Sequence, residues 1–500
     1  MPEFPQVDRP RSSPAGPATA ASASPLVGVP LAWPAAADDL PRRFPSRAAL
    51  AAELQRQFPA ALGPGPGQPP AAGLSPIPGG RRAAEARLAA IAPDRYGRSR
   101  NHLEGGVTRL SPYIRHGVLT LAEVRDAVFT WLQGSGRPRR EAEKLINELG
   151  WRDYWQRLWR QRGDAIWHDL EPLKTGHAPS AYAAELPDDL RHGRTGLACM
   201  DAFSAELTGT GWLHNHARMW LAAYVVHWRR VRWQAGARWF LQHLLDGDPA
   251  SNNLSWQWVA SSFSTKPYLF NRANLERYGG GPFCAGCSAA AAGTCPFEAS
   301  YEELQAQLFA PGAQPIPAGS PSGSVDPSSS AGGAPAAALP SRPILWIHGE
   351  ALGPANPALR ANPGQPALFV FDDALIAGQT ATSGDGSNAG GAASPLSLKR
   401  LAFLQECLLE LPVTIRRGDV AAELLAFAHR HGADAIVTSA GVDPRFEAIR
   451  TRLATALPVQ VLPPEPFVAL AEKETDLGRF GRYWRRAEPR VWAGVPVQGA

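Results

Sequence analysis

Two stretches of this chain, TGWLHNHARMW at residues 210–220 and DGDPASNNLSWQW at residues 246–258, mix amides, acids and an arginine with tryptophans. Buried polar groups need hydrogen-bond partners, because leaving one unsatisfied costs free energy. A wet surface that is merely rich in tryptophan explains this mixture less well than an internal polar pocket. The polar members of the two stretches are Asn215, Arg218, Asp246, Asp248, Asn252 and Asn253.

The sequence around these stretches is helical in pattern. From residue 79 to about residue 310, segments such as LTLAEVRDAVFTWL and HNHARMWLAAYVVHWRRV carry apolar residues at helical spacing. We therefore expect one large all-α domain over residues 79–310.

The rest of the chain differs from this domain. Residues 342–490 alternate short β-branched runs (PILWIH, ALFVFD, PVTIRR, DAIVTS, PVQVL) with helices, which predicts a parallel α/β sheet of about five strands. Residues 311–341 are rich in Pro, Gly and Ser and are predicted to be a flexible linker. Residues 1–78 are predicted to be disordered or of low complexity, with a possible short helix at residues 46–58.

Two further segments of the helical domain are candidates for a binding site. Short hydroxyl residues in VTRLS, residues 107–111, precede a helix and could bind an anion, although a plain helix cap is the simpler explanation of this segment by itself. ELGWRDYW, residues 148–155, places a carboxylate, a tryptophan and an arginine on one helix. An ordinary amphipathic helix with a surface ion pair remains the alternative.

The order of these motifs resembles the flavin domain of the photolyase/cryptochrome family over residues 90–310. The segments that carry the resemblance are TRLSPYIRHG, ELGWRDYW, RTGLACMDA, TGWLHNHARM, ARWFLQHLLDGDPASNNLSWQW and KPYLFN. Later segments, among them ILWIHGEALGPANPAL and FGRYWRR, resemble the family's antenna domain. The resemblance implies an N-terminal all-α FAD-binding photolyase domain followed by a C-terminal Rossmann-like parallel α/β domain, which is the reverse of the usual order and similar to a circular permutation.

The resemblance also implies a cofactor, FAD. In this chain the residues that match the family's FAD-binding positions are Tyr96, Thr108, Arg109, Leu110, Ser111, Arg152, Trp212, Asn215, Arg218, Asp246, Asp248 and Asn252. Asn252 would face the flavin nitrogen that becomes protonated, because an amide can donate or accept there without a fixed charge. The antenna chromophore stays uncertain, since IHGEALGPANPAL lacks the charged residues expected after the first strand.

The implied activity is the light-driven splitting of cyclobutane pyrimidine dimers in UV-damaged DNA, by electron transfer from reduced flavin. The residues that would meet the lesion are Glu148, Trp151, Asn215, Met219 and Trp258, and Trp256 and Trp233 match two members of the family's electron chain. The third position falls near Ser180, which is not aromatic; Trp228, Trp239 or Tyr182 could substitute, although each also suits packing.

Two alternatives remain open for the activity. His216 replaces an arginine that commonly meets DNA, which favours a cryptochrome-like photoreceptor without repair. His214 and His216 together favour a (6-4) photolyase. Arg100 and Lys266 are candidate phosphate contacts.

Four cysteines form a candidate metal site. Cys284, Cys287 and Cys295 have the spacing C-x2-C-x7-C, which is typical of metal binding, with unrelated loop thiols as the alternative. Resemblance to iron–sulfur bacterial photolyases adds Cys199 and implies a [4Fe-4S] cluster, with zinc as the fallback. Cys407 lies on an apolar helix and is predicted to pack in a core.

Composition sets wide limits on function. The net charge of +5 permits a nucleic-acid partner without requiring one. The sequence has no apolar run long enough for a membrane span and no secretory signal pattern, so a cytoplasmic protein is expected. It leaves the oligomeric state open, with a monomer as the default.

Overall fold

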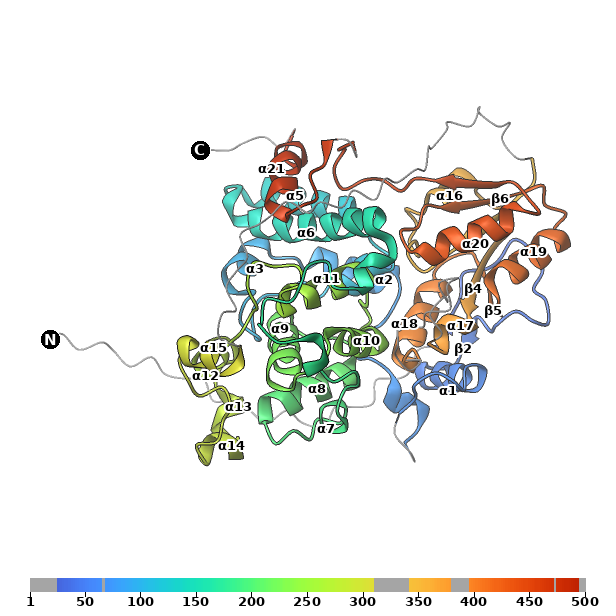
Figure 1. The fold of residues 1–500 in the computed structure, drawn as a ribbon. Coiled ribbons are helices and arrows are strands. Elements are labelled where there is room, and N and C mark those ends of the chain that lie inside the picture. Colours follow the sequence, from blue (N-terminus) through green and yellow to red (C-terminus); the bar gives the residue numbers. More distant parts are fainter. Residues whose placement is uncertain (1–24, 65–67, 310–340, 379–394, 472–473, 494–500) are drawn as a thin grey trace, which may run out of the picture.

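The computed structural model describes residues 25–64, 68–309, 341–378, 395–471 and 474–493. It consists of a helical body and a sheet body that lie side by side (Figure 1). The predicted linker at residues 311–341 lies outside the described residues except for Ser341. None of the described helices is long and apolar enough to cross a membrane.

The predicted all-α domain is confirmed as the helical body. Its helices are α2 (Arg81–Ala89), α3 (Pro93–Ser99), α4 (Ser111–Arg115), α5 (Leu121–Ser135), α6 (Arg140–Arg162), α7 (Asp188–Arg191), α8 (Ala198–Thr210), α9 (Asn215–Ala223), α10 (Trp233–His243), α11 (Pro249–Ala260), α12 (Arg272–Gly279), α13 (Pro282–Ala285), α14 (Ser288–Ala291) and α15 (Tyr301–Leu308). Short 3-10 turns occur at Pro70–Gly73, Gly163–Trp167 and Pro179–Ala181, and one π-helical turn follows α9 at Tyr224–Trp228.

The predicted parallel sheet is confirmed as well. Its five strands are β3 (Pro343–Ile347), β4 (Ala367–Asp372), β5 (Thr414–Gly418), β6 (Ala435–Ser439) and β7 (Val459–Leu462), in the order β5-β4-β3-β6-β7. All neighbouring pairs are parallel. The helices of this part are α16 (Pro357–Ala361), α17 (Asp373–Ile376), α18 (Leu398–Leu409), α19 (Val420–Arg430) and α20 (Pro444–Ala454).

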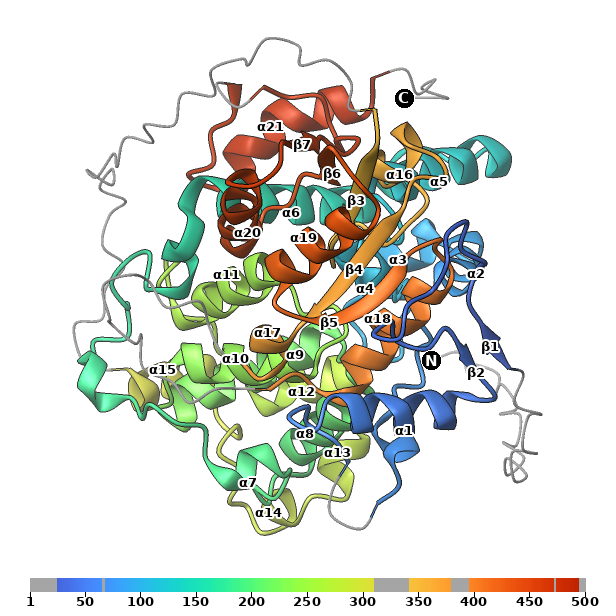
Figure 2. The ribbon, with the colours of Figure 1, turned by 90° about the vertical axis from the view of Figure 1, so that its right-hand side faces the viewer.

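Successive side chains of a strand point to opposite faces of the sheet, so alternate residues of the strands belong to two different cores. Ile344 and Trp346 of β3 pack with Leu424 of α19, whereas Leu345 and Ile347 belong to the large core that contains α18. Figure 2 shows α19 lying across the sheet. The sheet is therefore covered on both faces, as parallel sheets usually are.

Helix α18 is buried around its whole circumference, including the charged side chains of Lys399, Arg400 and Glu406. Arg400 donates to the backbone carbonyls of Leu241 and Gly247 in the helical body. Burial, and then the neighbouring Arg115, lower the pKa of Arg400 to about 9. Helix α18 thus joins the two bodies by packing in a shared core.

The expectation that residues 1–78 lack packed structure is wrong from residue 25 onwards. The predicted short helix exists as α1 (Arg47–Gln57), and a small hairpin of β1 (Leu26–Val27) and β2 (Arg43–Phe44) precedes it. The Leu40 amide donates to Ile415 O on edge strand β5 at 2.7 Å. The segment is ordered because it covers this edge and α18, a tertiary contact that its low-complexity composition does not reveal. Residues 1–24 lie outside the described residues.

The boundary of the α/β part is also different from the expectation. The segment FGRYWRR begins α21 (Phe480–Val491), which packs on α6 of the helical body and not on the sheet (Figure 1). Tyr483 Oη donates to Asp153 Oδ2 at 2.5 Å, and Tyr154 Oη donates to Leu477 O at 2.8 Å. Residues 25–62 therefore pack on the sheet body, which follows late in the sequence. Helix α21 packs on the helical body, which precedes it.

The close approach of α21 to α6 requires Gly150. A Cβ atom at this position would lie 2.1 Å from the ring of Trp484. We expect Gly150→Ala to lower the free energy of unfolding by about 1–3 kcal/mol, because overpacking forces the helices apart. Urea denaturation measures this effect.

Gly134→Ala is the matched control, since Gly134 lies inside α5 with no atom within 4 Å of a Cβ. That change should raise stability by about 0.4–1 kcal/mol through loss of unfolded-chain entropy. Equal stability of the Gly150→Ala variant and the unchanged protein would contradict the tight docking of α21.

Candidate functional site

The two tryptophan-rich stretches meet where α9 and α11 begin. Arg218 Nη2 lies 3.0 Å from Asp246 Oδ1 and 2.8 Å from Asp246 Oδ2, and its Nε donates to Leu213 O at 2.8 Å. The Asp246 side chain is 5% exposed. This buried ion pair fixes the loop before α11 relative to α9.

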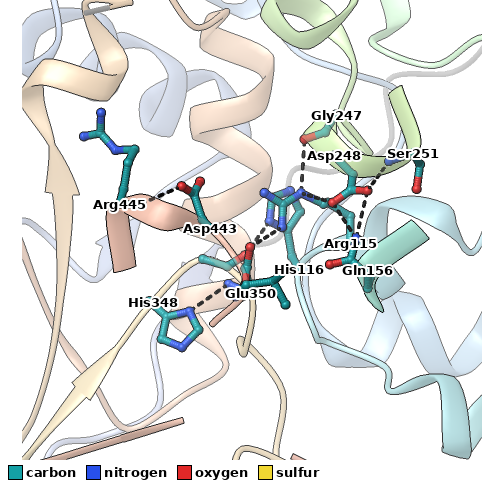
Figure 3. Close-up of polar contacts among 12 residues, drawn as sticks. Arg115, His116, Gln156, Gly247, Asp248, Ser251, His348, Glu350, Asp443 and Arg445 are labelled. Carbon is teal, nitrogen blue, oxygen red and sulfur yellow. Dashed lines mark hydrogen bonds and ion pairs between the residues drawn. The ribbon is translucent and has the colours of Figure 1, made fainter. Parts of the chain in front are cut away.

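Asp248 is the most enclosed acid of the site, and its side chain has no exposed surface. It caps α11 by accepting from the Ser251 amide at 2.8 Å, and Gln156 Nε2 of α6 lies 2.9 Å from both of its oxygens. Arg152 lies 3.2 Å from Asp248 Oδ2. Arg115 lies 3.7 Å from Asp248 Oδ1 (Figure 3). Burial alone would raise the pKa of Asp248, but the two arginines and the Ser251 amide outweigh burial and lower it.

Arg115 connects this acid to the sheet body. Its Nε donates to Gly247 O at 3.1 Å, and its Nη1 lies 3.3 Å from Glu350 Oε1 in the loop after β3 (Figure 3). Glu350 Oε2 in turn accepts from the Val442 amide at 3.0 Å. Burial, and then Glu350, raise the pKa of Asp443 to about 6. Sequence inspection did not assign Arg115, Gln156 or Glu350 to the site.

Two buried arginines of this region have lowered pKa values. Burial is the main cause that lowers the pKa of both Arg152 and Arg400, and Arg115 lowers both further despite the nearby carboxylates. Arg109 adopts a left-handed backbone with φ 52°, which a residue with a side chain rarely adopts without a local reason. Its guanidinium lies 4.5 Å from the ring centre of Trp212. An anionic ligand such as a dinucleotide diphosphate would suit these groups.

The residues predicted to face a lesion come from α6, α9 and α11. Glu148 Oε1 lies 3.2 Å from Arg100 and 3.0 Å from Lys144. Burial, followed by the charge of Glu148, raises the pKa of Tyr96, so Tyr96 and Glu148 share one environment. At the start of α9, Asn215 Nδ2 lies 3.6 Å from Met219 Sδ.

The two tryptophans of this set differ in their surroundings. Trp258 is 39% exposed and therefore available to a ligand. Trp151 is stacked on Phe480 of α21 with ring centres 3.8 Å apart and planes at 10°. One face of Trp151 is thus covered by a helix that the sequence placed in the other domain.

Residues 145–278 match the FAD binding domain of DNA photolyase. The deoxyribodipyrimidine photo-lyase of Streptomyces griseus is 36% identical over 161 residues, which cover 32% of this chain and 33% of that protein. The enzyme of the same name from Synechococcus is 31% identical over 227 residues, covering 40% and 43%. The match therefore spans less than half the length of these curated relatives.

A solved bacterial class III photolyase from Agrobacterium tumefaciens is 25% identical, covers 48% of this chain and 52% of its own, and has a TM-score of 0.37. Together, the family model and the curated relatives support the photolyase/cryptochrome resemblance of the helical body and its FAD-binding character. They do not address the reversed order of the two bodies.

The photolyase-like segment contains the predicted electron-chain tryptophans in buried positions. Trp256 and Trp233 are each 2% exposed. Trp233 Nε1 donates to Asp169 Oδ1 at 2.5 Å, a partner 64 residues away that sequence inspection missed. Ser180, at the position of the third tryptophan, lies in an exposed 3-10 turn.

The three aromatic substitutes for that tryptophan all make packing contacts. Tyr182 Oη and Thr175 Oγ1 share a hydrogen bond of 2.7 Å, and Trp228 Nε1 donates to Pro296 O at 3.1 Å. Trp239 is buried beside Phe240. Lys266, a predicted phosphate contact, is exposed just after α11.

The two histidines beside the photolyase-like site are enclosed. Burial is the main cause that lowers the pKa of both His214 and His216 to about 4. The charge of His216 also lowers the pKa of His214, and the charge of Arg100 also lowers the pKa of His216. Both rings are therefore neutral at pH 7. His214 caps α9 by accepting from the His216 amide at 3.1 Å.

The four predicted metal ligands share one region of the photolyase-like domain. Burial, and then the neighbouring Cys284, Cys295 and Cys287, raise the pKa of Cys199 to about 12. Burial would also raise the pKa of Cys287, but backbone amides, Ala198 first, outweigh it and lower the pKa. Within the described ranges, no three His, Cys, Asp or Glu side chains form a group that could hold a metal. The four cysteines thus lie near one another, but their thiols are not arranged as a set of metal ligands.

Removal of the Asp248 charge should destabilise the protein in a pH-dependent way. We expect Asp248→Asn to lower the free energy of unfolding by about 3–5 kcal/mol at pH 7, because two arginines lose a buried partner. The folded-state pKa of Asp248 is lowered, so its contribution is present above the unfolded value of about 3.9 and is lost as the pH falls through the folded value. Urea denaturation from pH 7 to pH 3 should show the two proteins converging.

Asp189→Asn is the control, because Asp189 pairs with Arg229 at the surface, where both side chains are partly exposed. That change should cost less than about 1 kcal/mol. A gap between Asp248→Asn and the unchanged protein that stays constant with pH would show that the Asp248 charge is unimportant.

Proposed function

We propose that this chain is an FAD-dependent, light-driven DNA photolyase that splits cyclobutane pyrimidine dimers in UV-damaged DNA by electron transfer from reduced flavin. The observation that carries the proposal is the position of the five lesion-facing residue types inside the photolyase match at residues 145–278, on helices that pack together. These residues are Glu148, Trp151, Asn215, Met219 and Trp258.

The residues around Asp246 suit FAD, which when bound would supply the light-excited electron donor. Arg218 and Asp246 would hold the charged part of the ring system, and Arg109 with the Thr108–Ser111 turn would hold phosphate. Asn252 Nδ2 donates to Ala237 O at 3.0 Å and to Asn253 Oδ1 at 3.1 Å, so the protein fixes the direction of this amide.

Glu148 is suited to bind the pyrimidine edge of a dimer. Its carboxylate accepts hydrogen bonds, and Arg100 and Lys144 beside it can stabilise negative charge that develops on the base. The exposed Trp258 offers an indole face for stacking a flipped base.

Three observations favour other members of the family. Phe480 covers one face of Trp151, and His216 stands where an arginine commonly meets DNA; both favour a cryptochrome-like photoreceptor without repair. The neutral, neighbouring His214 and His216 favour repair of (6-4) lesions.

A repair assay separates these functions. The FAD-loaded, reduced protein is irradiated with oligonucleotides that carry either a cyclobutane dimer or a (6-4) lesion, and the remaining lesion is quantified. We expect loss of the dimer only, and Glu148→Ala should slow repair by about 10²-fold because it removes the hydrogen-bond acceptor that positions the dimer.

Glu141→Gln is the control on the same helix, since Glu141 lies in the first turn of α6 and pairs with the exposed Arg137. It should leave repair unchanged. If the unchanged protein binds flavin and repairs neither lesion, the photoreceptor becomes the better assignment; selective loss of the (6-4) lesion would establish the third function.

We further propose that Cys199, Cys284, Cys287 and Cys295 bind a [4Fe-4S] cluster, with zinc as the fallback, and that the α/β body is an antenna domain placed after the flavin domain. Support for the metal comes from the proximity of the four thiols: burial is the main cause that raises the pKa of Cys199, and Cys284, Cys295 and Cys287 are near enough to raise it further. Anaerobic purification followed by iron, sulfide and zinc analysis tests this site.

We expect Cys287→Ser to remove most of the metal, because thiolates are the preferred ligands of both candidates. Cys407→Ala is the control: Cys407 is buried in α18, where the Gly80 amide donates to its sulfur at 3.1 Å. Full metal content in Cys287→Ser would exclude the site.

A further inference from the structure

The indole N–H of Trp233 has a carboxylate as its hydrogen-bond partner. Trp233 Nε1 donates to Asp169 Oδ1 at 2.5 Å, while the indole is 2% exposed. Asp169 itself is exposed. A buried oxidisable ring is therefore connected, through one short hydrogen bond, to a base that reaches solvent.

The loop that carries Asp169 is held by Gln257, the residue between Trp256 and Trp258. Gln257 Nε2 donates to Ile166 O at 3.1 Å, and its Oε1 accepts from the Leu170 amide at 3.0 Å. Gln257 is fully buried. One side chain of the WQW motif thus fixes the loop on both sides of Asp169.

Trp233 is the first residue of α10, and Trp256 of α11 packs on the same helix. A Cβ atom at Gly236, three residues after Trp233, would lie 2.2 Å from the ring of Trp256. Trp256 therefore packs directly on the helix turn that follows Trp233. Ser180 stands where the family's third tryptophan falls, so a proton acceptor beside Trp233 would hold the oxidation at Trp233 itself.

We propose that Asp169 is the proton acceptor that traps oxidised Trp233 as a neutral indolyl radical, and that Gln257 is the residue that positions it. The inference rests on the proposed flavin function. Bound FAD, when photoexcited in its oxidised form, would take one electron from Trp256, and Trp233 would then supply one electron to Trp256. The Trp233 radical cation transfers its Nε1 proton to the Asp169 carboxylate, which gives a neutral radical and a carboxylic acid. A solution thiol returns one electron, and the proton returns to Nε1.

The experiment measures the tryptophan radical and not repair. FAD-loaded protein is excited with a blue laser pulse, and the neutral radical is followed by transient absorbance and electron paramagnetic resonance in H₂O and D₂O. In Asp169→Asn we expect the radical to decay at least about tenfold faster, since a positioned base accelerates proton transfer by about 10²–10⁴-fold. The solvent isotope effect should disappear, and Asp169→Glu should restore part of both.

Two controls separate this role from a structural one. Asp164→Asn changes an exposed acid in the same segment and should leave the radical unaltered. The ¹⁵N resonance of the Trp233 indole reports the hydrogen bond without illumination, and it should move in Asp169→Asn while the other indole resonances stay in place.

Equal radical lifetimes and isotope effects in Asp169→Asn and the unchanged protein would overturn the inference, as would the absence of any tryptophan radical. Neither result touches the proposed function, because repair is assayed with chemically reduced flavin. Failure of repair with a normal Trp233 radical would leave the role of Asp169 intact.

Discussion

A single carboxylate without exposed surface connects the parts of this protein on which its chemistry depends. Asp248 caps α11, accepts from Gln156 of α6 and pairs with Arg115, which in turn reaches Glu350 of the sheet body. Ion pairs removed from water stabilise only when their remaining hydrogen-bonding capacity is satisfied. Asp248 meets that condition with partners from several elements, so α6, α11 and the loop after β3 cannot shift independently.

Sequence patterns predicted the regular elements well where each element buries its own apolar residues. The long amphipathic α6 and the β-branched strands of the parallel sheet are examples. The short helix at residues 46–58 was predicted, but the packing of residues 25–62 was missed because Leu40 and Phe44 are buried against β5 and α18, elements that follow far along the chain. The antenna resemblance of FGRYWRR likewise did not reveal that α21 packs on α6, since its contact depends on the space left by Gly150.

The candidate site was predictable in its residue types but not in its pairings. Arg218 and Asp246 could be assigned to one pocket because both stand among tryptophans. Arg115 and Glu350 are separated by 235 residues, and no local pattern links them. The covered face of Trp151 could not be foreseen either, because Phe480 reaches it from the last described helix.

The crossed packing of the two chain ends has a consequence for synthesis. A ribosome releases residues 25–62 long before β5, the edge strand that they cover, and it releases α21 after the sheet strands although α6 emerges early. The helical body therefore cannot finish folding until α21 has emerged, whereas residues 25–62 have to wait for the sheet that they cover. A transcript that stops after the sheet would leave apolar helix surface bare, whereas loss of the first segment would expose a strand edge to other chains. A gene rearrangement that separates the two bodies would have to keep residues 25–62 with the sheet body and α21 with the helical body.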